Sequence, residues 1–423
     1  NNSSFLDNKW NSCCSRSWTI LCRLCAIWTM RPSLILGYGA TGKDIEKYLI
    51  SENKKYFIYD DNKIIPQKFN FQIEDITNLE MIYVSPGVKK DHKILNIAEE
   101  SNTKVTTDIE YFNNVSNVKI VGVTGTNGKT TFVSLLNKIL NKHGYKSNVG
   151  GNIGISPLNL INDADNLDFM ILELSSFQLH HINELHLDTS VVLNIYEDHI
   201  DWHNSFEEYA SSKLKIFNFT KKVKNKFLGS VDEELKINES SLENVTVIED
   251  INDYFLPNYF DEFVTMFVAV CNRFEISEKD VIDFLSSEPS AEHRFELFHT
   301  KNGVNFINDS KSTNLESVNK ASLKVNNCML IMHGLTKGIN TKKLELSDEI
   351  KKIFVPKNSE FDLSLYQSIV VQYESMEDLQ QLIKENYQNF NTVLFSCGGS
   401  SFSDFDNYID RGTYFKNMIV GEI

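Results

Sequence analysis

The chain has 423 residues, more than one hydrophobic core usually serves, so two or three domains are expected. Hydrophobic residues make up 41% and charged residues 23%, a composition typical of a folded soluble protein and not of a disordered or fibrous chain. The formal net charge of -15 repels a phosphate backbone and argues against general nucleic-acid binding. Membrane insertion is not expected, because the most hydrophobic early stretch, Trp18 to Trp28, is short and is interrupted by Arg23.

Residues 1–29 differ from the rest of the chain, since they hold three of the four Trp and four of the seven Cys residues. Cys22 and Cys25 form a CxxC pair, but no second pair follows at the spacing of a zinc site, and a redox pair would be expected inside a βα unit. We therefore interpret residues 1–29 as a non-native or upstream extension and Met30 as the expected start. The remaining cysteines, scattered as is typical of a reducing cytoplasm, are Cys271, Cys328 and Cys397.

From Leu34 onward, apolar runs, glycines and amphipathic stretches alternate, as in an α/β protein with parallel strands. Three blocks can be separated, at residues 30–117, 118–290 and 291–423. The predicted strands are Ser33–Leu36, Tyr56–Tyr59 and Met81–Val84 in the first block, Val118–Val123, Phe169–Leu172 and Ser190–Asn194 in the second, and Val304–Ile307, Met329–Met332 and Thr392–Phe395 in the third. The predicted helices are Lys43–Ile50, Thr130–His143 and Met376–Tyr387.

A glycine-rich turn follows the first predicted strand. Gly37, Gly39 and Gly42 satisfy GxGxxG, and Asp60 stands at the end of the second predicted strand, as a dinucleotide-binding fold requires. Taken alone, this pattern favours NAD, because such glycines let the backbone approach a diphosphate closely. An NAD-dependent dehydrogenase or a nucleotide-dependent switch protein is therefore one alternative.

A second glycine-rich segment, GVTGTNGKTT from Gly122 to Thr131, follows an apolar strand and opens a helix, as a phosphate-binding loop does. Backbone N–H groups of such a loop surround phosphates, Lys129 can reach the β/γ oxygens, and the Thr130 hydroxyl can hold Mg²⁺. The strict P-loop formula is not met, because Val123 stands five positions before Gly128, and a tight βα turn with a helix cap is the alternative. The predicted ATP contacts of the loop are Gly125, Thr126, Asn127, Gly128, Lys129, Thr130 and Thr131.

Three further positions bear on metal chemistry. Glu173 ends an apolar strand, where its carboxylate can complete the coordination of a Mg²⁺ held by Thr130, unless it is a solvated strand-end residue. His199 and His203 have the spacing of a zinc pair, but HIDWH lacks the glutamate that a zinc protease needs beside its first histidine. Lys213, in ASSKLKIF, is by itself typical of an exposed helical lysine.

TGTNGKTT resembles the ATP loop of the Mur ligases and folylpolyglutamate synthases, which join an amino acid to a carboxylate using ATP. Later segments resemble, in order, the D-glutamate-adding Mur ligases, and the resemblance spans Met30 to the end. The resemblance implies a cytoplasmic ATP-dependent ligase of peptidoglycan precursor synthesis. Such a ligase adds D-glutamate to UDP-N-acetylmuramoyl-L-alanine through an acyl phosphate. The alternative is another Mur ligase or a folylpolyglutamate synthase-like ligase. The segments are GGNIG, LELSSFQL, NIYEDHIDWH, SSKLKIF, EHRFE, NDSKSTN and SSFSDFDNYIDRG.

The resemblance implies roles for particular residues. His199 would bind a second Mg²⁺ or Mn²⁺, supported by a carbamate that Lys213 forms with CO₂; a neutral amine, favoured beside a cation, is what attacks CO₂. Asn152 would hold phosphate and the substrate carboxylate, Arg294 the ATP phosphates, and Asp309 the ATP ribose. The implied D-glutamate contacts are Lys311, Thr313, Lys337, Ser401 and Phe402. The implied contacts to the UDP substrate are Gly39, Ala40, Thr41, Asp60, Ser85, Gly87, Asn152, Ser175 and Gln178.

The predicted fold class is α/β with three domains. Residues 30–117 would form a Rossmann-like domain that binds the UDP substrate, residues 118–290 a central P-loop-type ATPase domain, and residues 291–423 a Rossmann-like domain that binds D-glutamate. Asn258–Asp261 stands where the family has its adenine-side segment. Small-molecule substrates and a monomer are expected, without nucleic acid or membrane insertion. The predicted catalytic residues are Lys129, Glu173, His199, Lys213 and Asn152, a set for positioning and charge neutralisation rather than a nucleophile triad.

Overall fold

The computed structural model describes residues 31–235, 237, 242–248, 254, 256, 259–289, 291–336, 340–402 and 404–422. The predictions made for residues 1–29, Asn258 and Lys337 lie outside this part of the chain. The chain divides into two compact units, and each is described by itself. The first unit comprises residues up to 119 with 150–170 and 177–186, and the second comprises 120–149, 171–176 and 187 onward.

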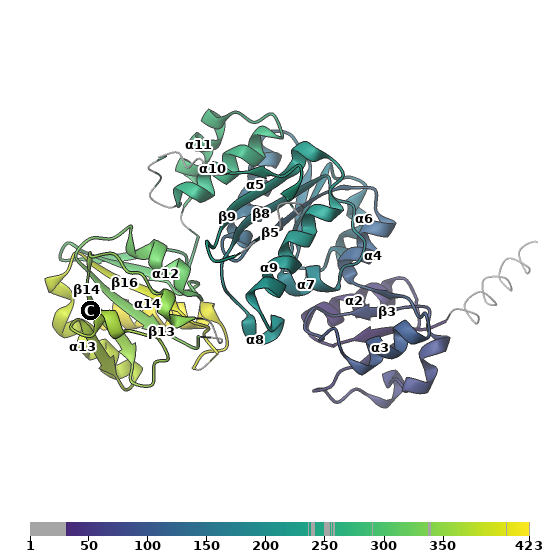
Figure 1. Cartoon of the computed structure of the whole chain (residues 1–423), viewed down its shortest axis with the longest axis horizontal. Coiled ribbons are helices and arrows are strands. Elements are labelled where there is room, and N and C mark those ends of the chain that lie inside the picture. The colour runs from purple at the N-terminus through teal and green to yellow at the C-terminus, as the bar shows by residue number, and fades with distance from the viewer. Residues whose placement is uncertain are drawn as a thin grey trace, which may run out of the picture. The chain divides into compact units, whose positions relative to one another are not determined.

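The first sheet is parallel, with strand order β2-β1-β3-β4. Figure 1 labels its strand β3 and the helices α2 and α3. The interior strands of this sheet are apolar, and Leu34, Ile82 and Val84 are buried in a core completed by Phe71 and Leu79. Because the strands are parallel, their carboxyl ends share one edge, where ligands of open α/β sheets bind. The elements are β1 (Ser33–Leu36), α2 (Ala40–Ser51), β2 (Tyr56–Tyr59), η1 (Gln67–Phe69), η2 (Ile73–Asn78), β3 (Ile82–Val84), α3 (Lys93–Glu100), β4 (Val105–Thr106) and α4 (Asp108–Val115).

The second sheet has strand order β10-β9-β8-β5-β7-β6, with β8 parallel to both β5 and β9. Its strands are β5 (Lys119–Thr124), β6 (Ser147–Gly151), β7 (Phe169–Glu173), β8 (Thr189–Ile195), β9 (Lys226–Val231) and β10 (Thr246–Val247). The helices of the second unit up to residue 290 are α5 (Lys129–Lys142), α8 (Ile200–His203), α9 (Phe206–Leu214), η4 (Lys215–Phe219), η5 (Val223–Asn225), α10 (Asp261–Asn272) and α11 (Glu278–Ser287). The chain between β6 and β8 also forms η3 (Pro157–Leu160), α6 (Ile161–Ala164) and α7 (Ser176–His181), of which η3, α6 and all of α7 but Ser176 belong to the first unit.

The third sheet has strand order β11-β12-β16-β13-β14-β15, with β11 antiparallel to β12 and the other neighbours parallel. Strand side chains alternate between its faces, so Met329 and Ile331 of β13 join one buried cluster while Leu330 and Met332 join the other. The strands are β11 (Glu296–Lys301), β12 (Val304–Asp309), β13 (Cys328–His333), β14 (Ile350–Pro356), β15 (Val370–Tyr373) and β16 (Thr392–Gly398). The helices are α12 (Leu315–Ser322), η7 (Thr341–Lys343), η8 (Ser364–Tyr366), α13 (Met376–Asn386), η9 (Tyr387–Asn389) and α14 (Tyr408–Glu422).

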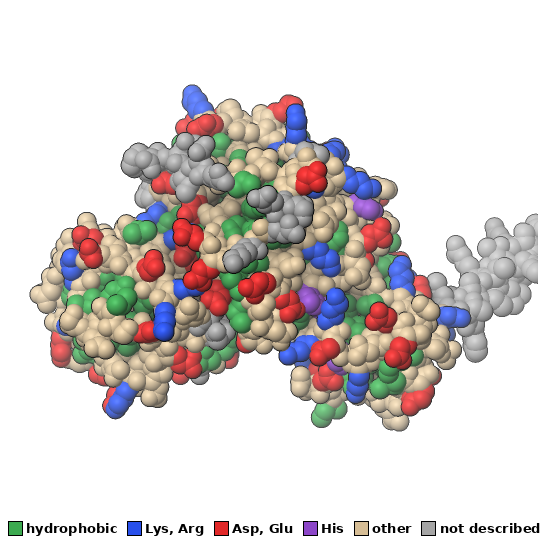
Figure 2. All heavy atoms as spheres, in the orientation of Figure 1, with side chains coloured by type: hydrophobic (Ala, Val, Ile, Leu, Met, Phe, Trp, Pro, Cys, Tyr) green, Lys and Arg blue, Asp and Glu red, His purple; other side chains and the backbone are tan. Residues whose placement is uncertain are grey.

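The α/β fold class predicted from the sequence is confirmed, and every predicted strand is present at its predicted place. Within the described part of the chain, no helix has the length and hydrophobicity needed to cross a membrane. Figure 2 shows acidic and basic side chains interspersed on the face it draws. Cys271, Cys328 and Cys397 are buried free thiols.

Candidate active site

The glycine-rich loop between β5 and α5 has the backbone of a phosphate-binding loop. Gly128 has a φ of 84°, and α5 begins directly after it. A β-carbon on Gly125, whose φ is 153°, would lie 3.0 Å from Leu193 Cβ. The loop is fixed to β8, because the Thr126 N–H donates to the Asn194 carbonyl at 2.9 Å. Glycine is therefore needed at these turns, and the N-terminus of α5 lies at the loop, as anion binding requires.

Asn194 holds the loop with its side chain as well, and sequence reasoning missed it. The Asn127 N–H donates to Asn194 Oδ1 at 2.8 Å, and Asn194 Nδ2 donates to the Asn127 carbonyl at 3.2 Å. A polar residue at the end of the buried run Val191–Leu193 is a signal that could have pointed to it.

Lys129 lies over this loop. Its ammonium donates to the Gly125 carbonyl at 2.7 Å and to the Thr126 carbonyl at 2.9 Å. These contacts hold the cation against the backbone of the loop that is predicted to bind phosphates. Thr130 and Thr131 follow in the first turn of α5, and both are half-buried.

Lys213 is buried, with only 2% of its surface exposed. The expectation of an exposed helical lysine, drawn from its spacing alone, was therefore wrong. The Lys213 Nζ donates to the Gly125 carbonyl at 2.8 Å and lies 4.6 Å from the centre of the Tyr209 ring. Tyr209 also hydrogen-bonds Thr126 Oγ1 through its hydroxyl at 3.0 Å. Helix α9 thus places a lysine amine directly under the phosphate-binding loop.

The pKa of Lys213 is held well below its ordinary value, first by burial and then by the charge of Lys129. The carboxylates of Asp198 and Glu173 oppose this lowering. Lys213 therefore loses its proton more readily than an ordinary lysine, and two carboxylates act electrostatically on it. Carboxylate oxygens are the ligands that Mg²⁺ prefers. This donor set fits a magnesium ion next to the loop, and Asp198, which sequence reasoning missed, belongs to it.

Arg294, Asp309 and Lys311 form the second part of the site. The Asp309 carboxylate accepts from Ser396 Oγ at 2.8 Å and from the Phe295 N–H at 3.1 Å, and burial raises its pKa to about 7. Burial, followed by the charge of Arg294, lowers the pKa of Lys311 to about 7. The charge of Glu173 opposes this lowering of the Lys311 pKa, and the charge of Lys129 adds to it. Lys311 is therefore close enough to Glu173 and to the lysine of the phosphate loop for their charges to act on it.

We expect anion binding at Lys311 to take up a proton above pH 7. The free amine has a pKa of about 7 and is largely neutral at pH 8, whereas a bound phosphate or carboxylate favours the ammonium and raises the pKa. Affinity should then fall as pH rises above 7, and the uptake should fade as pH falls well below 7, where the free amine is already protonated. Calorimetric titration with ADP at pH 8 in buffers of different ionisation enthalpy measures the uptake. Its persistence in Lys311→Met would contradict the assignment.

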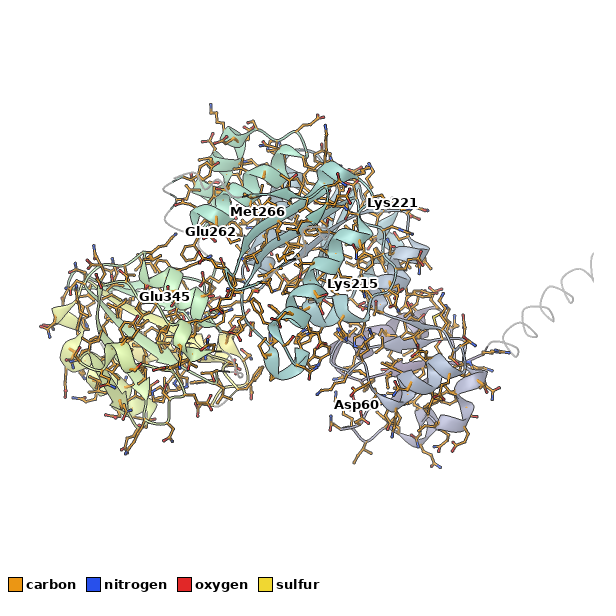
Figure 3. All side chains as sticks on the ribbon, in the orientation of Figure 1. Asp60, Lys215, Lys221, Glu262, Met266 and Glu345 are labelled. Atoms are coloured by element: carbon orange, nitrogen blue, oxygen red, sulfur yellow. The ribbon has the colours of Figure 1, made fainter. Side chains whose placement is uncertain are left out.

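A cavity beside the phosphate loop has an aromatic wall. Tyr259 and Phe263 stack with ring centroids 5.5 Å apart, and Leu193 and Met266 complete the apolar lining; Figure 3 labels Met266 on α10. Such a wall suits a flat base. Tyr259 and Phe260, from the segment predicted to lie at the adenine, line this cavity, whereas Asn258 lies outside the described residues. The predicted site residues that also line it are Asn127, Gly128, Thr131, Arg294, Asp309 and Lys311.

Lys320 supplies a further cation to the cavity wall. Its Nζ lies 2.9 Å from the Tyr196 hydroxyl and 2.5 Å from a Glu262 carboxylate oxygen. Glu262 is labelled on α10 in Figure 3. Sequence reasoning gave none of the three a role: Glu262 and Lys320 lie outside the quoted motifs, and Tyr196 lies within NIYEDHIDWH, where only His199 was assigned one.

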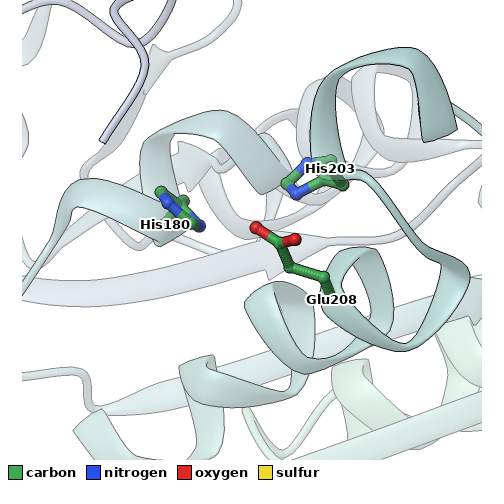
Figure 4. Close-up of side chains that lie close together, drawn as sticks. All are labelled: His180, His203 and Glu208. Atoms are coloured by element: carbon green, nitrogen blue, oxygen red, sulfur yellow. The ribbon is translucent and has the colours of Figure 1, made fainter. Parts of the chain in front are cut away.

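His199 and His203 have different neighbours and do not form a zinc pair. The His203 ring is buried, hydrogen-bonds Ser176 Oγ at 2.9 Å, and lies at the end of α8 with Glu208 of α9 facing it in Figure 4. The His199 side chain is 36% exposed, and its Nε2 lies 3.7 Å from Asp198 Oδ2. His199 therefore stands beside a carboxylate of the predicted magnesium site, and its role as a ligand stays a prediction.

The residues predicted to bind D-glutamate lie in loops of the third sheet. Thr313 is half-buried and Ser401 is buried, whereas Phe402 is 73% exposed and Lys337 lies outside the described residues. The aromatic residue beside Lys311 is Tyr408, which sequence reasoning missed. The Lys311 ammonium donates to the Tyr408 hydroxyl at 2.9 Å and lies 4.3 Å from the ring centre.

A separate cavity lies at the carboxyl ends of β1, β2 and β3. A β-carbon on Gly42 would lie 2.2 Å from the Gly37 carbonyl oxygen, so the GxGxxG turn packs too tightly for a side chain there. Asp60, labelled in Figure 3, accepts from the Tyr38 N–H at 2.6 Å and the Asn62 N–H at 2.9 Å. The predicted residues that line this cavity are Gly39, Ala40, Thr41, Asp60, Ser85, Gly87 and Asn152.

Ser175 and Gln178, also predicted to contact the UDP substrate, are not among the residues that line this cavity, and their role stays a prediction. Ser175 follows β7 and is buried, and Gln178 is buried within α7. Lys89 and His92 do line the cavity at β1, β2 and β3, and sequence reasoning missed them.

Comparison with known proteins agrees with this fold and site. Residues 123–252 match the Mur ligase middle domain. A "UDP-N-acetylmuramoylalanine--D-glutamate ligase" of Thermotoga petrophila is 30% identical over 427 residues, covering 90% of this chain and 97% of the relative. The chain therefore belongs to the Mur ligase family, and it is a carbon-nitrogen ligase of that family.

Solved structures show the same fold at lower identity. A MurF ligase from Thermotoga maritima in complex with ADP aligns with a TM-score of 0.60 at 15% identity, covering 94% of this chain and 97% of that chain. FolC from E. coli, in complex with DHPP and ADP, aligns with a TM-score of 0.53 at 15% identity, covering 74% of this chain and 92% of that chain. At these identities the likeness concerns the fold alone.

Proposed function

We propose that this ligase adds D-glutamate to UDP-N-acetylmuramoyl-L-alanine, with ATP activating the carboxylate as an acyl phosphate. The observation that supports it most is the cluster of cations around the phosphate loop: Lys129, Arg294 and Lys311 share one electrostatic environment with Glu173. The relative from Thermotoga petrophila has a name that states this amino acid, and its alignment covers nearly the whole chain. We also propose a cytoplasmic monomer with domains at residues 30–117, 118–290 and 291–423.

The phosphate loop and Lys129 would bind the ATP phosphates, since they present backbone N–H groups and a fixed ammonium to them. The wall of Tyr259 and Phe263 would hold the adenine, and Asp309 the ribose. Arg294 and Lys311 would neutralise charge as the γ-phosphoryl group moves to the substrate carboxylate. A carboxylate anion is a poor electrophile, so this activation precedes attack by the amine of D-glutamate.

Glu173, Asp198, His199 and Thr130 would hold two Mg²⁺ ions, together with a carbamate on Lys213. Magnesium would supply neutralisation of phosphate charge. The buried Lys213 amine, its pKa lowered, would attack CO₂, forming an N–C bond and releasing the amine proton. The carbamate replaces a cation with an anion at this position, which removes the repulsion between an ammonium and a metal ion.

At the other substrate, Gly39, Ala40 and Thr41 would approach the UDP diphosphate, because α2 begins at Ala40. Asp60 would contact the uridine end and Asn152 the phosphate and the substrate carboxylate. Thr313, Lys337 and Ser401 would complete the D-glutamate pocket around Lys311. Two carboxylates on that amino acid need cations and hydroxyl groups, which this set supplies.

Release of phosphate from ATP tests the proposal. We expect release that requires both UDP-N-acetylmuramoyl-L-alanine and D-glutamate, and little release when L-glutamate, meso-diaminopimelate or a folate replaces the matching substrate. Mass spectrometry of the product should show a UDP-sugar dipeptide. Release that depends on a folate, or that is indifferent to D-glutamate, would overturn the assignment while leaving ligase chemistry in place.

A further inference from the structure

Arg411 of α14 is completely buried in the third sheet's domain, which is rare for arginine. No carboxylate of the described residues forms an ion pair with it. Its guanidinium instead donates to backbone carbonyls. Nη1 donates to His333 O at 2.8 Å and to Gly399 O at 2.9 Å, and Nη2 donates to Ser310 O at 2.7 Å.

The three carbonyls belong to three different loops at the carboxyl edge of the sheet. Ser310 follows β12, His333 ends β13, and Gly399 follows β16. Two of them stand close before described residues that are expected at the amino-acid substrate: Ser310 directly precedes Lys311, and Gly399 stands two residues before Ser401.

Close packing holds these loops around the guanidinium. A β-carbon on Gly334 would lie 2.8 Å from Arg411 Nη1 and 2.2 Å from the Ser400 carbonyl oxygen. The N–H groups of Leu335 and Ser400 donate to each other's carbonyls at 3.1 and 2.8 Å, which joins the β13 loop to the β16 loop. A change in the side chain of Arg411 should therefore shift the β13 loop and the β16 loop together.

The β12 loop is tied to α14 in a second way. Ser310 Oγ donates to the Tyr408 carbonyl at 3.0 Å, and a β-carbon on Gly412 would lie 2.3 Å from Ser310 Oγ. Tyr408 in turn contacts the Lys311 ammonium. The start of α14 and the β12 loop thus form one packed unit with Arg411 inside it.

We propose that Arg411 is a positioning residue for the amino-acid substrate: its guanidinium fixes the spacing of the three loops that form the pocket. This rests on the proposed function for the identity of the amino acid. A guanidinium presents five donors from separate nitrogens in a fixed plane, so it can bridge carbonyls on three loops, whereas a lysine presents its three donors from a single atom. The buried cation also adds positive potential below a pocket proposed for a dicarboxylate.

Arg411→Lys tests the proposal, because it retains the charge and the aliphatic stem while losing the fork. We expect the KM for D-glutamate to rise at least about tenfold, since two charged hydrogen bonds are lost, while the KM for ATP changes less than about twofold. Amide hydrogen exchange should accelerate at residues 310–313, 334–336 and 399–402 together.

Arg273→Lys is the matched control. Arg273 donates to Asn225 Oδ1 and Asp188 Oδ2, both at 2.8 Å, away from these loops. We expect it to lower the melting temperature without changing the KM for D-glutamate. If Arg411→Lys does not fold, Ser310→Ala removes the single bond to Tyr408, and it should raise the same KM by a smaller factor.

The outcomes separate this inference from the proposed function. A lower melting temperature with an unchanged KM for D-glutamate would overturn the positioning role. Accelerated exchange confined to α14 would overturn it as well. If the wild-type protein shows no turnover with D-glutamate but Arg411→Lys still loosens all three loops together, the proposed amino acid is wrong and the positioning of the loops stands.

Discussion

Replacing Lys213 with alanine is expected to lower kcat about a thousandfold, the scale of removing a group that neutralises charge in a phosphoryl-transfer site. The side chain is buried under the phosphate loop, and its pKa is lowered by burial and by Lys129. These conditions favour a neutral amine that can form a carbamate. The variant lacks both the amine and the anion it would become.

Short carboxylates should restore part of the activity of Lys213→Ala, because acetate or formate can enter the space of the lost side chain and supply an anion in place of the carbamate. Phosphate release measured with and without these salts, at constant ionic strength, tests this. Lys221→Ala removes an exposed lysine, labelled in Figure 3, and should behave as the wild-type protein. Full activity of Lys213→Ala without any carboxylate would refute the role.

A second readout separates the carbamate from a simple ammonium. Wild-type activity should fall when CO₂ and bicarbonate are removed from the buffer, and it should recover when bicarbonate is returned. Nuclear magnetic resonance with ¹³C-labelled bicarbonate should show a carbamate carbon that is absent from Lys213→Ala. Activity that is independent of bicarbonate, together with no such signal, would assign Lys213 to a purely structural contact with Gly125.

Sequence reasoning predicted most of the strands that carry the motif loops, because their signals are local, but it missed β6, which leads into GGNIG. The apolar runs that become β1, β5 and β12 each end in a glycine-rich or polar loop, and this pattern is visible within a few residues. Strand β11 was missed because its residues alternate irregularly between half-buried and exposed positions along the sheet edge. Antiparallel pairing at that edge depends on β12 and leaves little trace in β11 itself.

The parts of the site that sequence reasoning missed depend on tertiary contacts. The burial of Lys213 follows from the packing of α9 under the phosphate loop, and helical spacing alone indicates an exposed residue. Arg411 was not selected, because its role is defined by carbonyls that lie 12 to 101 residues away in the chain. Tyr408 was missed for the same reason, since its contact with Lys311 joins residues 97 positions apart. Motifs predict the chemistry of a loop, whereas distant neighbours determine which side chain reaches it.

Replacing Lys129 with methionine is expected to lower kcat by about a thousandfold or more, an effect as large as that of Lys213→Ala. The Lys129 ammonium donates to the Gly125 and Thr126 carbonyls of the phosphate loop. From this position we expect it to neutralise the charge of the γ-phosphoryl group during transfer. Methionine keeps an unbranched apolar stem and is about as good a helix former as lysine, so α5 should form unchanged. The KM for D-glutamate should change little, because that substrate contacts other loops in the proposed function.

Single-turnover measurements of ADP formation place the defect of Lys129→Met in the first chemical step. We expect acyl phosphate formation, followed as ADP in the absence of D-glutamate, to slow as much as the complete reaction does. Lys142→Met, at the exposed end of the same helix, is the matched control and should show wild-type rates. Normal ADP formation by Lys129→Met with slow product formation would place the lysine in the amide-forming step instead.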